Sequence, residues 1–195
     1  PELVGAVGGP DQPAPTERAD TAGDVFLAAT DPHFDILSAA IGNDSDRLRI
    51  DVSVAGPIDV GGDTDQARIV FFFDTRPGGS TSNPWGRAID TDVQADYFLG
   101  SWTDNGGGVL FYEWTGSFWM IQPVQVGGID GLQQDLTGKA DGIVRYAIPL
   151  IDLGLMIGET VSFDIVTTDD RRTGPIEPGI DHLSNPAIAT PDYDT

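Results

Sequence analysis

The chain has 195 residues, 39% of them hydrophobic, and no cysteine, which suits one globular domain with a core of ordinary size. Ten Lys and Arg stand against 31 Asp and Glu, so the formal net charge is −21. A surface of this charge repels phosphate backbones and anionic lipids, and the sequence has no apolar run of the roughly 18 residues that a membrane-spanning helix needs. We therefore expect neither nucleic-acid binding nor membrane insertion.

The two ends of the chain differ from its middle. Residues 1–21 begin with a short apolar segment and continue with prolines and glycines, the composition of a linker. Residues 173–195 contain prolines throughout, which exclude regular helix and central strand. The sequence predicts three parts: an N-terminal apolar segment and linker over 1–21, a folded body over 22–172, and an extended proline-rich tail over 173–195.

The body consists of short segments whose apolar residues alternate with polar ones. Residues 48–54 show the period of two most clearly, which predicts an antiparallel strand with one face in solvent. Residues 68–73 form a nearly continuous apolar run, as expected of a central strand. Further strands are expected over 36–41, 97–102, 109–114, 118–124, 143–148 and 161–166. Because no helical periodicity accompanies them, we predict an all-β fold, a single antiparallel β-sandwich (immunoglobulin-like or jelly-roll-like) of about eight to ten strands.

The order of four segments indicates a family. They are Asp31-Pro32-His33-Phe34-Asp35, Asp96-Tyr97-Phe98-Leu99, the aromatic stretch from Leu110 to Trp119, and Val161-Ser162-Phe163-Asp164. In this order they resemble the DOMON-like superfamily of extracellular sandwich modules, which includes family 9 carbohydrate-binding modules and glucodextranase-type C-terminal domains. The resemblance spans roughly residues 20–170. It implies a secreted or cell-surface location and binding of a polysaccharide or another glycan.

Calcium is the cofactor that the residue types favour. Hard cations take six to eight oxygen ligands, which Asp carboxylates and turn carbonyls supply, and the chain has 26 Asp against five Glu. Asp24, Asp35 and Asp164 are our candidate ligands, because the resemblance implies that residues at such positions, with one from a late strand, gather around a structural ion. The alternative is that Asp24 and Asp35 form Asx-turns while Asp164 faces water.

Catalytic arrangements are poorly represented. The two histidines, His33 and His182, are not accompanied by a nucleophile elbow, and the sequence has no phosphate loop, dinucleotide fingerprint or zinc-ligand spacing. Glu113 is the one Glu within an expected core strand, where a solvent-facing position explains it. We predict that the chain is not an enzyme.

Tryptophan provides the candidate sugar contacts, since pyranose faces stack on flat rings. Trp85 lies in a loop of Pro and Gly, where no strand alternation assigns it to the core, and Trp102 ends a strand near Asp104 and Asn105. A loop anchor tucked onto the sandwich is the other reading of Trp85. The first function predicted is thus a non-catalytic, calcium-stabilised extracellular sandwich that binds carbohydrate.

The N-terminal segment supports a second function. Leu3, Val4, Ala6 and Val7 form a short apolar stretch beyond a proline linker, as expected of a donor strand that adds to the sheet edge of a neighbouring subunit. The partner is then another copy of the chain, and the protein a structural subunit of a surface filament or layer. The sequence leaves both functions open.

Overall fold

The computed structural model describes residues 3–6, 15–25, 32–58, 67–89, 91, 93–103, 107–123, 131–169 and 179–183. Its strands are β1 (Leu3–Ala6), β2 (Thr16–Ala19), β3 (Ile36–Asn43), β4 (Arg47–Val54), β5 (Ala67–Asp74), β6 (Tyr97–Trp102), β7 (Gly108–Trp114), β8 (Trp119–Gln122), β9 (Gln133–Asp135), β10 (Ile143–Pro149), β11 (Thr160–Asp169) and β12 (Gly179–His182). Three 3-10 turns accompany them: η1 (Pro32–Phe34), η3 (Lys139–Asp141) and η4 (Leu150–Leu153).

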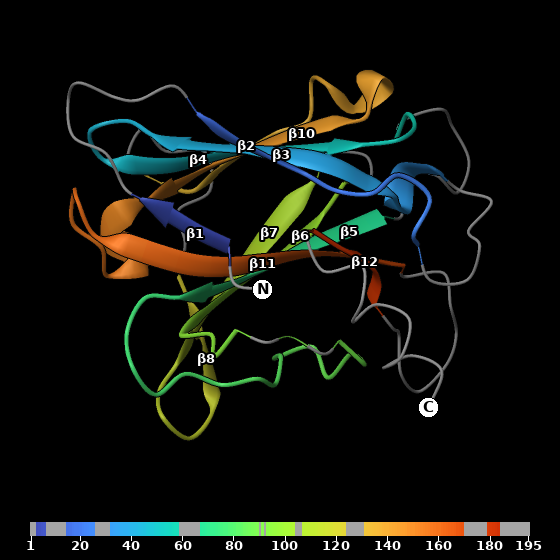
Figure 1. Cartoon of the computed structure of the whole chain (residues 1–195). Coiled ribbons are helices and arrows are strands. Elements are labelled where there is room, and N and C mark those ends of the chain that lie inside the picture. Colours follow the sequence, from blue (N-terminus) through green and yellow to red (C-terminus); the bar gives the residue numbers. More distant parts are fainter. Residues whose placement is uncertain are drawn as a thin grey trace.

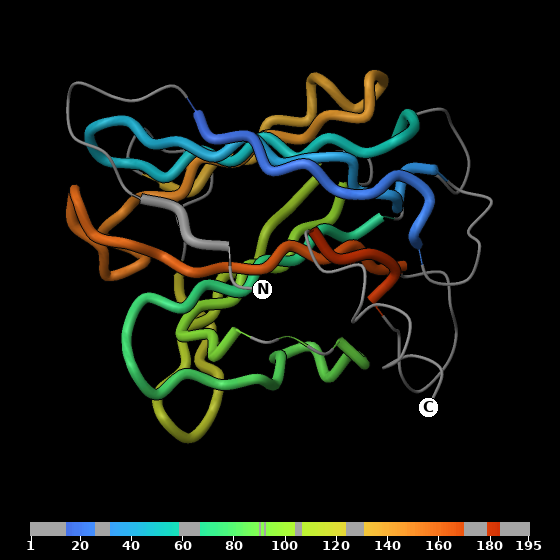
Figure 2. Tube along the Cα trace, in the orientation of Figure 1, coloured from blue at the N-terminus to red at the C-terminus, as the bar shows by residue number. Residues whose placement is uncertain are grey.

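The strands form two antiparallel sheets, packed as two layers (Figures 1 and 2). The seven-stranded sheet has the order β1-β11-β5-β6-β7-β8, and β12 also pairs with β11. The five-stranded sheet has the order β2-β3-β4-β10-β9. The predicted single antiparallel β-sandwich is confirmed, and each strand expected in the body is present with small shifts of its ends.

The main core lies between the two sheets and follows the alternation of the sequence. In β4 the apolar residues of 48–54 are buried, and Arg49 between them is exposed. In β5, Phe71 and Phe73 face the five-stranded sheet, and the Phe71 ring meets Tyr146 of β10 edge to face at 4.7 Å. The Tyr146 hydroxyl also forms a 2.6 Å hydrogen bond with the Ser101 hydroxyl of β6. A buried polar contact therefore joins the two sheets.

The seven-stranded sheet is covered on its other face as well. Val70 and Phe72 of β5, which point away from the main core, pack against Ile89, Val93 and Ala95 in a second cluster. The covering residues belong to the long connection between β5 and β6, which runs beneath the sheet in Figure 1. Burial on both faces explains why β5 is apolar without alternation.

Both predicted tails contribute strands. β2 pairs with β3 at one edge of the five-stranded sheet, with Ala19 opposite Ser38. β1 pairs with β11, with Leu3 opposite Phe163 and Ala6 opposite Thr160. β12 pairs with the other half of β11. The folded unit therefore extends beyond the predicted limits 22–172. The sequence did not indicate these strands, because four residues in a proline-rich segment are too few to show a period of two.

We expect Tyr146→Phe to lower the free energy of unfolding by about 1 to 2 kcal/mol, because the Ser101 hydroxyl then stays buried without its partner. Urea unfolding measures the change. Tyr112→Phe is the matched control, since Tyr112 is only half-buried on the opposite face of the sheet, and it should change little. Equal stability of the wild type and Tyr146→Phe would contradict a structural role for this hydrogen bond.

Candidate functional site

Three carboxylates from distant parts of the chain meet at one end of the sandwich. Asp20 follows β2, Asp24 lies in the turn beyond it, and Asp181 belongs to β12. One carboxylate oxygen from each lies within 4.8 Å of the others. Backbone pairing brings them together, since the Asp20 amide donates to the carbonyl of Leu37 in β3, and β12 pairs with β11.

Asp35 lies next to this group. It follows η1, and its Oδ2 accepts a 2.9 Å hydrogen bond from the Gly23 amide, in the turn that carries Asp24. Its Oδ1 is buried and has no hydrogen-bond partner among the described residues, and the same holds for both carboxylate oxygens of Asp24. Buried carboxylate oxygens are nearly always paired with a donor or a cation. We call Asp20, Asp24, Asp35 and Asp181 the acidic cluster.

The carboxylates of the acidic cluster are desolvated and repel one another. Asp181 is fully buried and accepts hydrogen bonds from the Ile36 amide at 2.6 Å and the His182 amide at 2.9 Å. Its burial, together with the charges of the other three carboxylates, raises its pKa to about 8. Burial likewise raises the pKa of Asp24 and of Asp35. A divalent cation at this position would offset both the desolvation and the repulsion.

Two of the three predicted metal ligands lie in the acidic cluster, and the third does not. Asp164 stands between Phe163 and Ile165 of β11, which face the main core, so its side chain points to the opposite face. There its Oδ2 lies 3.1 Å from Nδ1 of the buried His182. The late-strand carboxylate in the cluster is Asp181 instead, on the same face as its partner Thr167.

Sequence reasoning missed Asp20 and Asp181. Both lie in the predicted tails, and β12 is buried at all four residues, so no alternation marks Asp181 as inward-facing. The one indication of this site in the sequence was Asp181 itself, an acidic residue in a Gly-Ile-Asp-His segment that no expected strand or motif explained.

Trp85 is a packing residue of the sheet. Its indole lies directly over Gly100 of β6, where a Cβ would come within 2.0 Å of the ring. The ring also meets Phe98 edge to face at 5.4 Å, and the Arg87 guanidinium lies 4.9 Å from its centroid. Glycine inside a strand often marks such a close approach. The structure thus places Trp85 as the loop anchor that the sequence analysis gave as its other reading.

Trp102 occupies a similar position further along the same face. It is half-buried, and its indole covers Gly108 of β7, where a Cβ would lie 2.2 Å from the ring. Gln134 links Trp102 to Gly108. Its side-chain nitrogen donates to the Trp102 carbonyl, and its side-chain oxygen accepts from the backbone amide of Gly108. One ring face of Trp102 is therefore occupied by the protein.

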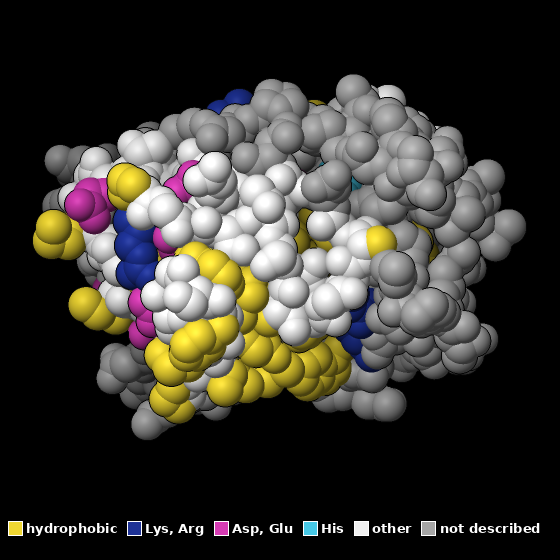
Figure 3. Space-filling model, turned by 90° about the horizontal axis from the view of Figure 1, so that it is seen from below, with side chains coloured by type: hydrophobic (Ala, Val, Ile, Leu, Met, Phe, Trp, Pro, Cys, Tyr) yellow, Lys and Arg dark blue, Asp and Glu magenta, His cyan; other side chains and the backbone are white. Residues whose placement is uncertain are grey.

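The exposed aromatic surface lies instead on the β7–β8 hairpin. Phe118 at its turn is 61% exposed and Ile121 of β8 is 55% exposed. Trp114 and Trp119 lie beside them, half-buried, with ring centroids 5.5 Å apart. Figure 3 shows hydrophobic side chains gathered in a patch on this underside of the molecule. We call these four residues the hairpin patch.

A polar cleft of about 340 Å³ adjoins the hairpin patch. Its lining includes Arg76, Asp96, Glu113 and Trp114. The Arg76 guanidinium donates to Glu113 at 2.9 Å and lies 5.1 Å from the centroid of the Tyr97 ring. Its pKa is raised, mainly by the hydrogen bond to Glu113. Asp96 is buried and accepts from the Thr75 and Arg76 amides, which fixes the loop that carries Arg76.

Glu113 has a defined role in this cleft. One of its oxygens accepts from Arg76, and the other accepts from the side-chain amide of Gln122 at 3.0 Å. The Glu113 carboxylate thus acts as a hydrogen-bond acceptor for two neighbouring side chains. The cleft therefore offers a ring, a cation and an acceptor side by side.

The candidate assembly residues divide between described and other parts of the chain. Leu3, Val4 and Ala6 belong to β1, which pairs with β11 of its own chain. Val7 lies outside the described residues.

Comparison with known protein families and with curated proteins finds no match for this chain. Within the described part of the chain, no helix has the length and apolar character to cross a membrane.

We expect Trp85→Ala to lower the free energy of unfolding by about 2 to 4 kcal/mol, because it removes the indole that covers the outer face of the seven-stranded sheet. Gly100→Ala should destabilise the wild type but have little effect in the Trp85→Ala background, since the clash is with the indole. Phe118→Ala, at an exposed position, is the control and should change stability by about 0.5 kcal/mol at most. Additive effects of Trp85→Ala and Gly100→Ala in urea unfolding would contradict this packing.

Proposed function

We propose that this protein is a non-catalytic, calcium-stabilised β-sandwich that binds carbohydrate through the hairpin patch and the cleft beside it. The observation that best supports binding is the adjacency of one exposed ring, that of Phe118, and two half-buried indoles to a fixed set of polar groups. Trp114 belongs to both the patch and the cleft, beside Arg76 and Glu113. Sugars present apolar faces that stack on rings and hydroxyls that need both donors and acceptors.

The charge of the molecule narrows the class of glycan. A net charge of −21 repels polyanions, so the proposed ligand is a neutral polysaccharide. Its hydroxyls would accept hydrogen bonds from Arg76 and donate to Glu113, while a sugar ring lies on Trp114 or Phe118. The sequence analysis assigned this contact to Trp85 and Trp102, but both of those rings rest on strand glycines.

The proposed calcium site is the acidic cluster. The side-chain atoms that would bind the metal are all carboxylate oxygens, which suit calcium or magnesium rather than softer metals. Buried oxygens of Asp24 and Asp35 lack a donor among the described residues, which is the arrangement that an ion would complete. Backbone carbonyls and water would supply the remaining ligands. Calcium sites of extracellular modules are weak, so such a site agrees with the proposed secreted or cell-surface location.

We expect roughly tenfold weaker binding of a neutral polysaccharide by Phe118→Ala, which removes an exposed stacking surface. Affinity electrophoresis in gels containing a panel of neutral and acidic polysaccharides measures the change. Ile151→Ala is the matched control, because Ile151 is 82% exposed elsewhere on the surface. If the wild type is retarded by no polysaccharide, or if both variants migrate with the wild type, the carbohydrate proposal fails.

Calcium should raise the melting temperature by several degrees relative to chelator at pH 8, because it offsets carboxylate repulsion. In chelator, stability should fall as pH rises from about 4 towards 8. The reason is that Asp181 has a pKa of about 8 when folded, against an ordinary value of 3.8, so the folded state disfavours its ionised form. The calcium effect should therefore be larger at pH 8 than at pH 5.

Asp181→Asn tests the location of the site. It should abolish most of the response of the melting temperature to calcium, because it removes one carboxylate ligand from the acidic cluster. Asp141→Asn is the control, since Asp141 is exposed on η3. A wild-type melting temperature that is the same in calcium and in chelator would refute the site.

A further inference from the structure

One edge of β11 receives strands from two separate segments of the chain. β5 pairs with residues 162–169 of β11, so it occupies the first edge. β1 pairs with residues 160–163 and β12 with residues 166–168, and both therefore lie along the second edge (Figure 1). β12 comes from the same end of the chain as β11, whereas β1 comes from the opposite end.

The backbone pairing of β1 with its own body is short. The pairing of β1 consists of a four-residue antiparallel ladder with β11. Residues 7–14 join it to β2, which lies in the other sheet. These eight residues include Gly8, Gly9, Pro10 and Pro13, the composition of a linker. A ladder of this length is a small part of the backbone pairing of a seven-stranded sheet.

We propose that β1 is exchanged between copies of this chain, so that β1 of one copy pairs with β11 of another in the register seen here. Exchange of an identical element preserves all of its native contacts, and only the path of the connecting segment changes. Main-chain pairing along the edge then supplies the affinity between copies.

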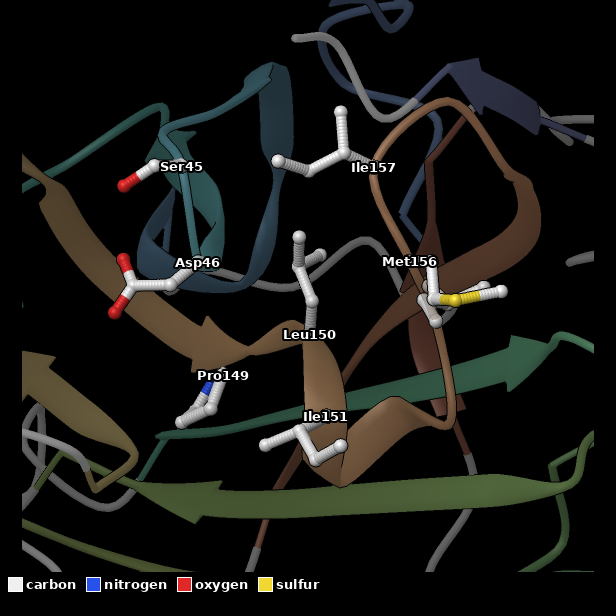
Figure 4. A pocket seen from close by; sticks show the side chains of 8 residues that line it. Ser45, Asp46, Pro149, Leu150, Ile151, Met156 and Ile157 are labelled. Atoms are coloured by element: carbon white, nitrogen blue, oxygen red, sulfur yellow. The ribbon is translucent and has the colours of Figure 1, made fainter. Parts of the chain in front are cut away.

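An apolar groove lies at the loop before β11. Ala6, the last residue of β1, is opposite Thr160, the first residue of β11, so this end of β1 lies beside the start of β11. In that loop Met156 is 70% exposed and Ile157 44% exposed. With Leu150 and the Ser45–Asp46 turn they line a groove of about 570 Å³ (Figure 4). A second copy joined through β1 is brought against this groove and would cover it.

The net charge of the chain makes the proposed exchange depend on salt concentration. Each copy carries a net charge of −21, and the repulsion between two copies falls as salt screens it. Exchanged species should therefore form in high salt and be disfavoured in low salt.

The test uses the absence of native cysteine. Val4 and Ser162 lie directly opposite each other in the β1–β11 ladder, at a separation that a disulfide can span. The single variants V4C and S162C are purified under reducing conditions, mixed in high salt and oxidised. Exchange predicts a V4C–S162C disulfide-linked species of at least twice the monomer mass, identified by mass spectrometry after digestion. Sedimentation then distinguishes a closed pair from a longer head-to-tail chain, and both contain the exchange.

Two controls distinguish exchange between copies from pairing within one chain. Ser53 and Ile143 are opposite each other in central strands β4 and β10, so a mixture of S53C and I143C should not crosslink between copies. The double variant V4C/S162C reports pairing within one chain. If it closes an internal disulfide while the mixed single variants stay uncrosslinked at every salt concentration, β1 remains in its own chain and the proposal is wrong. If neither forms a disulfide, the register on which exchange depends is itself refuted.

Discussion

The seven-stranded sheet buries both of its faces, and the arrangement of its aromatic side chains follows from this constraint. One face of β5 packs against the five-stranded sheet, and the other packs under the connection between β5 and β6. This connection must lie close to the strands to exclude water. Gly100 permits that approach, because the Trp85 indole rests where a side chain would otherwise stand. The cover packs on the outer sides of β5 and β6, and the β7–β8 hairpin at the sheet edge retains the exposed ring of Phe118.

The extent to which sequence predicts this structure depends on how many faces of a strand are buried. Residues 48–54 alternate because β4 has one wet face, so their strand and its inward residues could be predicted. β12 is buried at each residue, and its sequence therefore carries no period. Asp164 shows the opposite case, since its flanking apolar neighbours already indicated that it faces away from the main core. Gly100 likewise marked a close contact, but a strand glycine does not reveal which side chain approaches it.

The few basic residues of the chain serve partly as internal donors. Lys139 is buried, and its ammonium donates to the Thr103 carbonyl at 2.6 Å. Arg47 is also buried and donates to the Gly131 carbonyl. These hydrogen bonds hold loops to the sandwich, and Arg47 also lies 3.8 Å from the carboxylate of Asp46. With ten basic residues against 31 acidic ones, neutralisation falls to cations from the solvent. Among the described residues, the acidic cluster brings carboxylates close together, and Asp35 and Asp181 of the cluster are buried.

The two strands on the outer edge of β11 have separate roles because their pairings do not overlap. β12 holds residues 166–168 and brings Asp181 to the acidic cluster, whereas β1 holds residues 160–163 at the far end of the same edge. Removal of β1 leaves the β12 pairing, the cluster and the contacts of β5 with β11 in place. The proposed exchange of β1 therefore leaves these pairings of the body unchanged. This separation makes strand exchange compatible with a cation-stabilised domain, because the step that joins copies does not require the domain to open.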